Sequence, residues 1–336
     1  INMDKNHRKK VAVVILNWNG AKLLPQFLPS VVQNSEEAQI YVVDNASTDE
    51  SVFILQTQFP DIKIIQNRNN LGYAGGYNQA LKNVKEPYFV LLNSDVEVTK
   101  NWLLPLINLF ENNSDVAIIQ PKILDFNNKN QFEYAGAGGG FMDELGYPFC
   151  RGRIFDSLEQ DLGQYNDTRT IFWASGACFC IRKNVFDQLN GFDTSFFAYQ
   201  EEIDLCWRAF NQHLKVMYCG LSTVFHVGGG TFKQDNPRKT YLNFRNNLLM
   251  LVKNLPKGQL FKIIFTRLIL DGLAGIRFLF KGQLLHFIAI LNAHFSFYAM
   301  LKQSYGQRIK NPRKKYFHQK SIVSQYFLKN IKIFQD

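Results

Sequence analysis

The chain has 336 residues, of which 46% are hydrophobic and 14% aromatic, enough for a full-sized core in one large domain with an appendage. Its net charge of +10 is uneven: residues 1–232 carry 19 basic and 25 acidic side chains, a net of −6, whereas residues 233–336 carry 19 basic and 3 acidic ones, a net of +16. The five cysteines lack zinc-type spacing and the polar residues 4–10 lack the apolar core of a secretory signal, so we expect a reduced, cytoplasmic protein.

The first part of the chain alternates strand-like and helix-like segments. Apolar and β-branched runs predict strands, and helical patterns separate them. Because repeated strand–helix units form parallel sheets with helices on both faces, the sequence predicts an α/β fold with a mostly parallel sheet. The predicted strands are residues 11–16, 40–43, 62–65, 88–92 and 116–120, the last closed by Pro121.

Polar residues follow the ends of these strands, and right-handed crossovers place all of those ends on one edge of the sheet. There, Asp44 can accept a hydrogen bond from a base N–H or a ribose hydroxyl. The glycines at 72, 75 and 76 either let the backbone approach a ligand or allow tight helix–sheet packing, and they lack the spacing of a dinucleotide-binding motif. The residues expected at this edge are Asn17, Asp44, Asn70 and Asp95.

The segment Tyr88–Val98, YFVLLNSDVEV, joins a buried strand to an acidic end. Asp95 lies where open α/β sheets bind ligands, and it can offer oxygen to a hard divalent cation that in turn holds phosphate oxygens. Since Asn, Ser and Asp are also turn residues, an ordinary strand-ending turn is the alternative.

Periodicity is lost from Phe126 to Arg169, and the run Ile171–Ala177 predicts a further strand. Glu201 and Glu202 begin an amphipathic helix, where one of them can act as a general base or both can simply complement the helix dipole. His226 ends an apolar strand directly before glycines, and it is either a structural residue or a metal ligand.

Six segments, in this order, resemble the family 2 glycosyltransferases, which are inverting enzymes of the GT-A fold. The resemblance is closest to the rhamnosyltransferase-like and galactofuranosyltransferase-like branch, and it covers about residues 10–230, some two-thirds of the chain. The segments are VVDNASTD (42–49), NNLGYAGGYNQAL (69–81), LLNSDVEV (91–98), WASGACFCIRK (173–183), FFAYQEEIDLCWRA (196–209) and VFHVGGG (224–230).

The resemblance implies roles for the residues at the sheet edge. Asp44 would contact the nucleoside base, with Asn70 helping to hold it. Asp95 corresponds to the last acid of the family's D-x-D-type element and would bind Mg²⁺ or Mn²⁺ bridging the diphosphate. The first position of that element is Asn93 here, which leaves Asp95 as its one strong ligand, and His226 matches a downstream histidine that can complete the metal shell.

The resemblance also implies a catalytic base and a sugar pocket. Glu202 occupies the position of the base, where the family usually has Asp, and an exchange of roles with Glu201 stays open. Trp173, Ser175 and Gly176 would form part of the sugar and acceptor pocket.

Residues 231–336 are expected to form a helical, basic region after a catalytic domain at 10–230. Leu260–Phe280 keeps its charged residues on about half of a helical wheel, and Gln283–Leu301 is uncharged but contains His, Asn and Ser. We expect helices lying on an anionic membrane surface, the alternative being a helical cap with a solvated tail. Binding to nucleic acid is not expected, because no recognised motif accompanies the charge.

By resemblance, then, the chain is a metal-dependent inverting glycosyltransferase of the hexosyltransferase type. It would transfer a sugar, rhamnose-like or other, from a dTDP- or UDP-linked donor to a hydroxyl of a glycan or polyprenyl-diphosphate-linked acceptor in cell-surface polysaccharide synthesis. Its expected location is cytoplasmic, peripheral on the inner face of the cell membrane. Two alternatives stay open: a sugar-activating nucleotidyltransferase, which would need a basic glycine-rich loop that the first strand lacks, and a non-catalytic membrane scaffold descended from a transferase.

Overall fold

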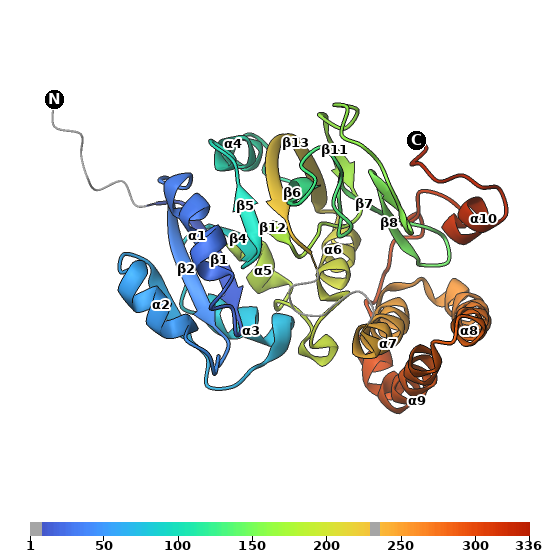
Figure 1. The fold of residues 1–336 in the computed structure, drawn as a ribbon. Helices are drawn as coiled ribbons and strands as arrows, with labels where there is room; N and C mark the ends of the chain where they lie inside the picture. The colour runs from blue at the N-terminus through green and yellow to red at the C-terminus, as the bar shows by residue number, and fades with distance from the viewer. Residues whose placement is uncertain (1–8, 229–235) are drawn as a thin grey trace, which may run out of the picture.

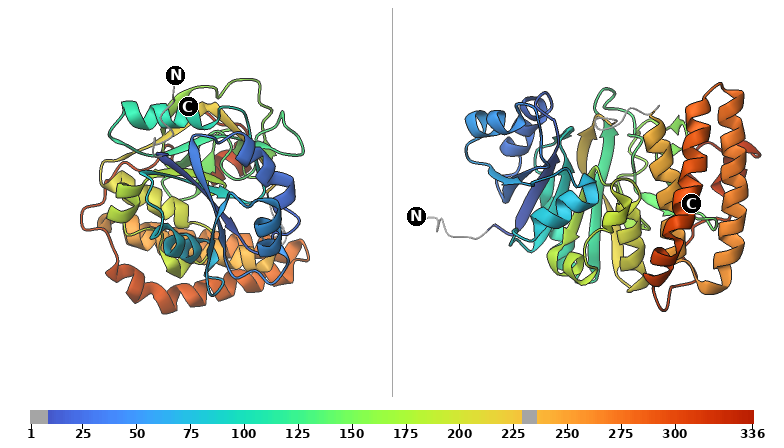
Figure 2. Two further views of the ribbon diagram at one scale, coloured as in Figure 1. Left: turned by 90° about the vertical axis from the view of Figure 1, so that its left-hand side faces the viewer. Right: turned by 90° about the horizontal axis from the view of Figure 1, so that it is seen from below.

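A computed structural model describes residues 9–228 and 236–336. A nine-stranded sheet carries helices on both faces, and helices α7, α8 and α9 are stacked at the end of the molecule away from α1 and α2 (Figure 1, Figure 2). The strands are β1 (Val11–Asn17), β2 (Ala38–Asp44), β3 (Lys63–Gln66), β4 (Tyr88–Asn93), β5 (Val96–Val98), β6 (Val116–Asp125), β7 (Gly140–Met142), β8 (Pro148–Cys150), β9 (Arg153–Ile154), β10 (Ser157–Leu158), β11 (Thr168–Ile171), β12 (Cys178–Arg182) and β13 (Lys215–His226).

The strand order of the large sheet is β11-β13-β6-β12-β4-β1-β2-β3, with β5 paired to β13. Strand β1 runs parallel to β2 and β4, whereas β12 is antiparallel to β4 and β6. Alternate side chains of β1 enter opposite layers: Val13 and Ile15 pack with α1, α2 and α4, and Ala12 and Val14 with α3, α5 and α6. The predicted α/β fold is confirmed, as a mixed and mostly parallel sheet.

Strand β6 runs past Pro121, so the prediction that this proline closes the strand is wrong. A proline cannot donate to the ladder, but neither neighbour requires a donor at this point. Strand β12 pairs with β6 only at residues 118 and 119, and β13 has an irregularity in register between Cys219 and Thr223, directly after the partner of Pro121.

The predicted strand Ile171–Ala177 is also wrong. Strand β11 ends at Ile171 and β12 begins at Cys178, with a turn between them in which Ser175 Oγ accepts a hydrogen bond from Ala177 N (3.2 Å). The aperiodic region before it contains the four-stranded sheet β10-β9-β8-β7, whose strands of two or three residues are too short to show a periodic pattern.

Helix α7 begins at Pro237, and Asn236 caps it by accepting a hydrogen bond from Arg238 N (2.8 Å). Its residues 248–252 are buried in the same hydrophobic cluster as α6 and one face of the large sheet. The division of the chain near residue 230 stays a prediction. The helices are α1 (Leu24–Gln33), α2 (Ser51–Gln58), α3 (Gly72–Leu81), α4 (Leu103–Asn112), α5 (Lys183–Gln188), η1 (Thr194–Phe196), α6 (Glu201–Asn211), α7 (Pro237–Asn254), α8 (Lys257–Phe280), α9 (Leu284–Gly306) and α10 (Ile322–Phe327).

Candidate active site

Asn17 and Asp44 end adjacent strands and are partners in the parallel register of β1 and β2. Asn17 Nδ2 donates to Asp44 Oδ1 (3.2 Å), and Ser47 N donates to Asp44 Oδ2 (3.0 Å). Asp44 is buried, so these bonds hold its carboxylate in one orientation at the sheet edge. Asp44 therefore lies at the predicted edge of the sheet, and its contact with a nucleoside base stays a prediction.

Asn70 is exposed beyond β3, and its side chain organises the start of α3. Its Oδ1 accepts hydrogen bonds from Asn45 Nδ2 (3.0 Å) and Gly72 N (2.9 Å). A Cβ atom on Gly72, whose φ is +69°, would lie 2.4 Å from Phe197 O. This glycine is therefore required by close packing against the loop at Phe197, which is neither the helix–sheet packing nor the ligand contact that the sequence suggested.

Asp95 and His226 meet because of strand register. Strand β5, which starts directly after Asp95, pairs antiparallel with β13 so that Val96 lies opposite His226. Asp95 Oδ1 and His226 Nε2 are 3.1 Å apart, both side chains are about 95% buried, and Asn93 Nδ2 is 3.3 Å from the same nitrogen. The three residues of the predicted metal motif thus form one cluster.

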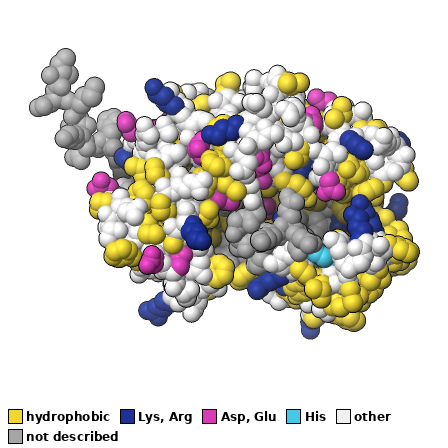
Figure 3. Space-filling view, viewed as in Figure 1, with side chains coloured by type: hydrophobic (Ala, Val, Ile, Leu, Met, Phe, Trp, Pro, Cys, Tyr) yellow, Lys and Arg dark blue, Asp and Glu magenta, His cyan; other side chains and the backbone are white. Residues whose placement is uncertain are grey.

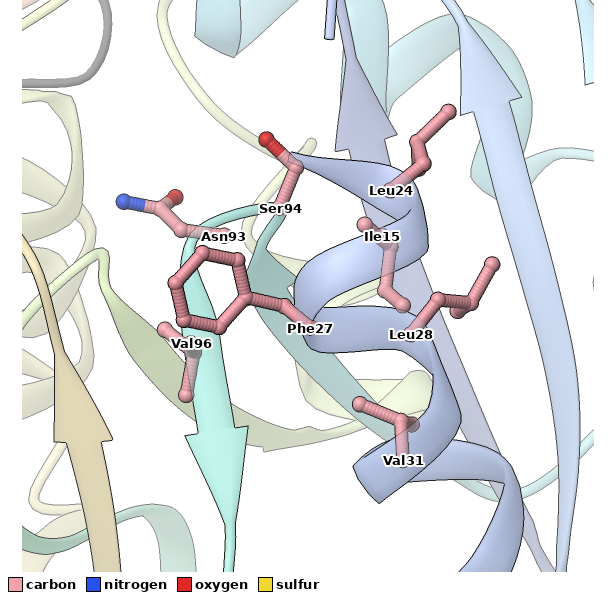
Figure 4. A pocket seen from close by; sticks show the side chains of 8 residues that line it. All are labelled: Ile15, Leu24, Phe27, Leu28, Val31, Asn93, Ser94 and Val96. Atoms are coloured by element: carbon pink, nitrogen blue, oxygen red, sulfur yellow. The ribbon is translucent and has the colours of Figure 1, made fainter. Parts of the chain in front are cut away.

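The other side of this strand end is apolar. Figure 4 shows the side chains of Asn93 and Ser94 pointing away from a group formed by α1, β1 and β5. The gap within that group has a volume of about 10 Å³, barely enough for one water molecule and too small for a nucleotide sugar. The apolar lining residues are Ile15, Leu24, Phe27, Leu28, Val31 and Val96.

Glu133 is a further member of the cluster, and the sequence analysis missed it. Its Oε1 is 3.3 Å from His226 Nδ1, an ion pair whose angle does not meet hydrogen-bond geometry, while Asp95 contacts the other ring nitrogen. Burial by itself lowers the pKa of His226, but the charges of Glu133 and Asp95 outweigh it and raise the pKa to about 10. Burial raises the pKa of Asp95, yet His226 reverses this, and the net shift is downward. Glu133 lies in the aperiodic region, where no local pattern marks it.

Asp95 and His226 would hold a divalent cation once His226 has released its proton, because a histidine ligand must be neutral. Neighbouring ligands of an octahedral ion at ~2.1 Å are ~3 Å apart, close to the 3.1 Å between Asp95 Oδ1 and His226 Nε2. Glu133 would orient the histidine ring from behind, as carboxylates do in many metal sites. Within the described ranges 9–228 and 236–336, no three or more His, Cys, Asp or Glu side chains converge on one point as a complete metal site. Ligands other than these side chains would have to complete the shell.

Glu201 and Glu202 open α6 with their carboxylates inside the protein. Their Oε2 atoms are buried, and neither has a hydrogen-bond partner in the part of the chain that the structure describes. Burial raises the pKa of Glu202 to about 7, and burial together with the charge of Glu202 raises the pKa of Glu201 well above its ordinary value. A carboxylate with an unused oxygen that titrates near neutral pH is suited to accept a proton.

The predicted pocket residues lie in the segment between β11 and β12. Trp173 is buried and its Nε1 donates to Phe141 O (2.7 Å), so its indole N–H already has a hydrogen-bond partner within the protein. Ser175 is buried in the turn before β12, and Gly176 O accepts a hydrogen bond from Tyr73 OH (2.9 Å). Contact of Trp173, Ser175 and Gly176 with a sugar stays a prediction.

A chain of contacts leads from the end of β4 to Tyr73. Asn93 N donates to Ala177 O (3.0 Å), next to Gly176, whose carbonyl binds Tyr73. Burial, and after it the charges of Tyr77, Glu201 and Glu202, raise the pKa of the Tyr73 hydroxyl well above its ordinary value. These hydrogen bonds connect the end of β4 with Tyr73 of α3, and the approach of Glu202 to Asp95 and His226 stays a prediction.

The family model of glycosyl transferase family 2 matches residues 12–189, more than half of the chain. The chain belongs to glycosyl transferase family 2. The matched segment contains Asp44, Asn70, Asp95 and the turn after β11, whereas Glu202 and His226 of this family 2 protein lie beyond it.

Relatives and solved structures agree with this assignment. A low-salt glycan biosynthesis hexosyltransferase of Haloferax volcanii is 25% identical over 283 residues, covering 82% of this chain and 86% of the relative. An N-acetylglucosaminyl-diphospho-decaprenol L-rhamnosyltransferase of Mycobacterium tuberculosis is 23% identical over 210 residues, or 57% and 68% of the two chains.

Among solved structures, a mannosyltransferase of Pyrobaculum calidifontis in complex with GDP-Man and Mn²⁺ has a TM-score of 0.52 at 14% identity, covering 90% of this chain and 78% of that one. GalNAc-T7 with UDP, GalNAc and Mn²⁺ has a TM-score of 0.58 at 16% identity, covering 76% and 49%. At these identities the likeness establishes the GT-A-like fold of the family 2 chain.

Proposed function

We propose that this family 2 protein is an inverting glycosyltransferase that moves a sugar from a dTDP- or UDP-linked donor to a hydroxyl of a glycan or polyprenyl-diphosphate-linked acceptor in cell-surface polysaccharide synthesis. The observation that carries the proposal is the buried contact between Asp95 and His226 (3.1 Å) just after β4, in a chain that also has a buried Glu202 oxygen without a hydrogen-bond partner among the described residues. The likeness to a decaprenol-linked rhamnosyltransferase supports a lipid-linked acceptor, and the hexosyltransferase relative supports a sugar donor.

In this proposal each group has a distinct task. Asp44 and Asn70 bind the nucleoside, and Asp95 and His226 hold Mg²⁺ or Mn²⁺. When bound, the cation neutralises the charge that grows on the departing diphosphate. Glu202 removes the proton of the acceptor hydroxyl as that oxygen attacks the anomeric carbon. One displacement from the side opposite the diphosphate inverts the anomeric configuration, and no covalent enzyme intermediate is needed.

A panel of donors tests the proposal directly. We expect a dTDP- or UDP-sugar to raise the melting temperature (Tm) of the protein in the presence of Mn²⁺ and much less without it. Ligand at ~100 times its Kd stabilises a protein by ~2.7 kcal/mol, enough to raise Tm by several degrees. The donor should also be hydrolysed slowly, and faster when an acceptor is added.

Two other results would redirect the assignment. If no nucleotide sugar stabilises the protein with or without Mn²⁺, the scaffold alternative is favoured. If stabilisation requires a nucleoside triphosphate and a sugar phosphate instead, the protein is a nucleotidyltransferase.

We also propose that α8 and α9 bind the protein to the inner face of an anionic membrane. Several polar side chains of this helical pair lie in its interior. His286 Nδ1 of α9 is 2.8 Å from Thr240 Oγ1 of α7, and His294 Nε2 is 3.3 Å from the buried Asp271 Oδ2 of α8. Polar groups thus lie inside the bundle, where they satisfy one another.

The outer face of the pair is apolar. Phe261, Phe280 and Phe295 are 83%, 89% and 71% exposed, and Figure 3 shows hydrophobic side chains gathered over this end of the molecule. A surface of this kind marks an interaction site, and the excess of basic residues after 232 favours anionic lipid over a second protein. The remaining exposed apolar residues of the pair are Phe265, Ile269, Leu273, Ile276, Leu279, Leu284, Leu285, Ile288, Leu291, Tyr298 and Tyr305.

Helix α9 (Leu284–Gly306) is long and apolar enough to cross a bilayer by length and composition, with a mean hydropathy of 1.5 over its most apolar window, and it is the single such helix in the described part of the chain. One helix of this kind is weak evidence for a span. Because its histidines bind α7 and α8, we favour an orientation in the plane of the membrane surface.

Flotation with vesicles tests the membrane proposal. The protein should float with vesicles that contain anionic lipid and dissociate as salt rises, because the screening length falls from ~10 Å at 0.1 M to ~3 Å at 1 M. Phe261→Glu combined with Phe280→Glu should abolish flotation. Phe53→Glu, at an exposed position of α2 far from the pair, is the matched control and should float normally. Attachment that resists salt and needs detergent for release would show insertion instead.

A further inference from the structure

The backbone that leads into Glu201 and Glu202 is strained. Phe197, Tyr199 and Gln200 have φ angles of 64°, 70° and 74°, in the left-handed region that residues with a Cβ atom rarely adopt. Three such residues within four positions persist only when the surrounding structure holds them, and such segments cluster at functional sites. The contacts of this loop show what holds it.

One side chain of α7 binds the loop at three carbonyl groups. Asn246 is fully buried, and its Nδ2 donates to Phe196 O (3.0 Å), Ala198 O (2.9 Å) and Tyr199 O (2.8 Å). Its Oδ1 accepts a hydrogen bond from Arg245 Nε (2.9 Å), which fixes the end of the amide that faces the loop. An apolar residue at position 246 would remove the amide donor that these three carbonyl groups share.

The neighbours of Asn246 on α7 extend this contact along the loop. Arg245 Nη2 donates to Ser195 O (3.0 Å), and Asn247 Nδ2 to Gln200 Oε1 (3.3 Å). Gln200 Nε2 in turn donates to Asn243 Oδ1 (3.2 Å). Helix α7 thus binds the loop from residue 195 to the first turn of α6.

The opposite side of the loop rests on α3. Phe197 O accepts a hydrogen bond from Tyr73 N (2.8 Å), and a side chain on Gly72 would collide with the same carbonyl. The loop is therefore held between the helix that follows Asn70 and the helix that carries Asn246. Any relaxation of the loop would rotate the first turn of α6 and redirect Glu202.

We propose that Asn246, oriented by Arg245, is a positioning residue that holds the loop of residues 196–200, with its positive φ angles at Phe197, Tyr199 and Gln200, and so aims Glu202 into the active site. The inference rests on the proposed function for the role of Glu202. It assigns to α7, outside the segment that matches the family model, a part in catalysis that does not involve contact with substrate.

The test compares Asn246→Ala with Leu249→Ala, which truncates a buried side chain of the same helix that is not part of the polar contact with the loop. Hydrogen–deuterium exchange of the full chain should show faster exchange of residues 194–204 in Asn246→Ala than in Leu249→Ala. In transfer assays kcat should fall at least ~10-fold in Asn246→Ala, with the donor Kd changed less than ~2-fold, because the base is misplaced while the nucleotide site is intact. Leu249→Ala should lower Tm without this loss of kcat.

Unchanged exchange of residues 194–204 in Asn246→Ala would overturn the inference, whatever the activity. Faster exchange with normal kcat would show that the contact orders the loop but does not position Glu202, which also overturns it. If Asn246→Ala is recovered only unfolded, Arg245→Lys takes its place in both measurements, because lysine keeps the charge but loses the Nε donor that orients the amide. A wild-type protein without transferase activity would refute the proposed function, while the exchange result still reports on the loop.

Discussion

Asp95→Ala is expected to abolish sugar transfer and the Mn²⁺-dependent part of donor binding. The variant removes the oxygen that lies 3.1 Å from His226 Nε2 and so removes one of the two proposed protein ligands of the cation. A divalent ion contributes several kcal/mol of charge stabilisation, so its loss should lower the rate by ~10³-fold or more. Calorimetric titration of the donor with and without Mn²⁺, together with a transfer assay, measures both effects.

Two variants control for this experiment. Removing one partner of a buried ion pair can destabilise the fold, so Asp95→Asn, which keeps the shape and one oxygen, separates metal binding from folding. Glu97→Ala changes a half-buried carboxylate two residues away that forms an ion pair with Lys129, and it should behave like the wild type. An unchanged Mn²⁺-dependent donor affinity in Asp95→Ala would show that the cation is held elsewhere.

Glu202→Gln is expected to lower turnover by ~10²-fold or more while the donor Kd stays nearly constant. Glutamine has the shape of glutamate and can still hydrogen-bond an acceptor hydroxyl, but it cannot take up its proton. Glu201→Gln should have the smaller effect, because burial and the charge of Glu202 raise the pKa of Glu201 well above its ordinary value and so favour its neutral form. The reverse order of effects would move the base to Glu201, and normal turnover in both variants would refute general-base catalysis by this pair.

The pH dependence provides a second measurement of the same residue. Burial raises the pKa of Glu202 to about 7, and a general base works only when deprotonated, so kcat/KM should rise with pH through about 7 and level off above it. In Glu202→Gln this rise should disappear. A carboxyl group whose pKa is raised on folding destabilises the protein once it ionises, so the glutamine variant should be at least as stable as the wild type at pH 8. A loss of activity accompanied by a lower Tm would point to misfolding instead.

The sequence by itself determined the sheet and the location of its ligand-binding edge. An apolar run such as Val11–Leu16 is enough to predict a buried strand, because its alternate side chains must enter the helical layers on both faces of the sheet. The polar residues that follow such a run mark the end of the strand. The positions of Asp44 and Asp95 at one edge therefore follow from the strand pattern and the handedness of the crossovers alone. The motif order around Glu202 and His226 likewise indicated the family.

Tertiary structure alone decided how these residues meet. His226 contacts Asn93 across 133 residues because β5 pairs with β13 in one register, and register depends on long-range packing that no local pattern contains. Glu133 joins them from a region without periodicity, and Asn246 holds a left-handed loop that its own residues would not favour alone. Tertiary structure also decided which face of α8 and α9 is exposed. Their polar residues form hydrogen bonds and ion pairs inside the bundle, which leaves the apolar face outside. A helical wheel shows which residues share a face, but not which face the rest of the protein covers.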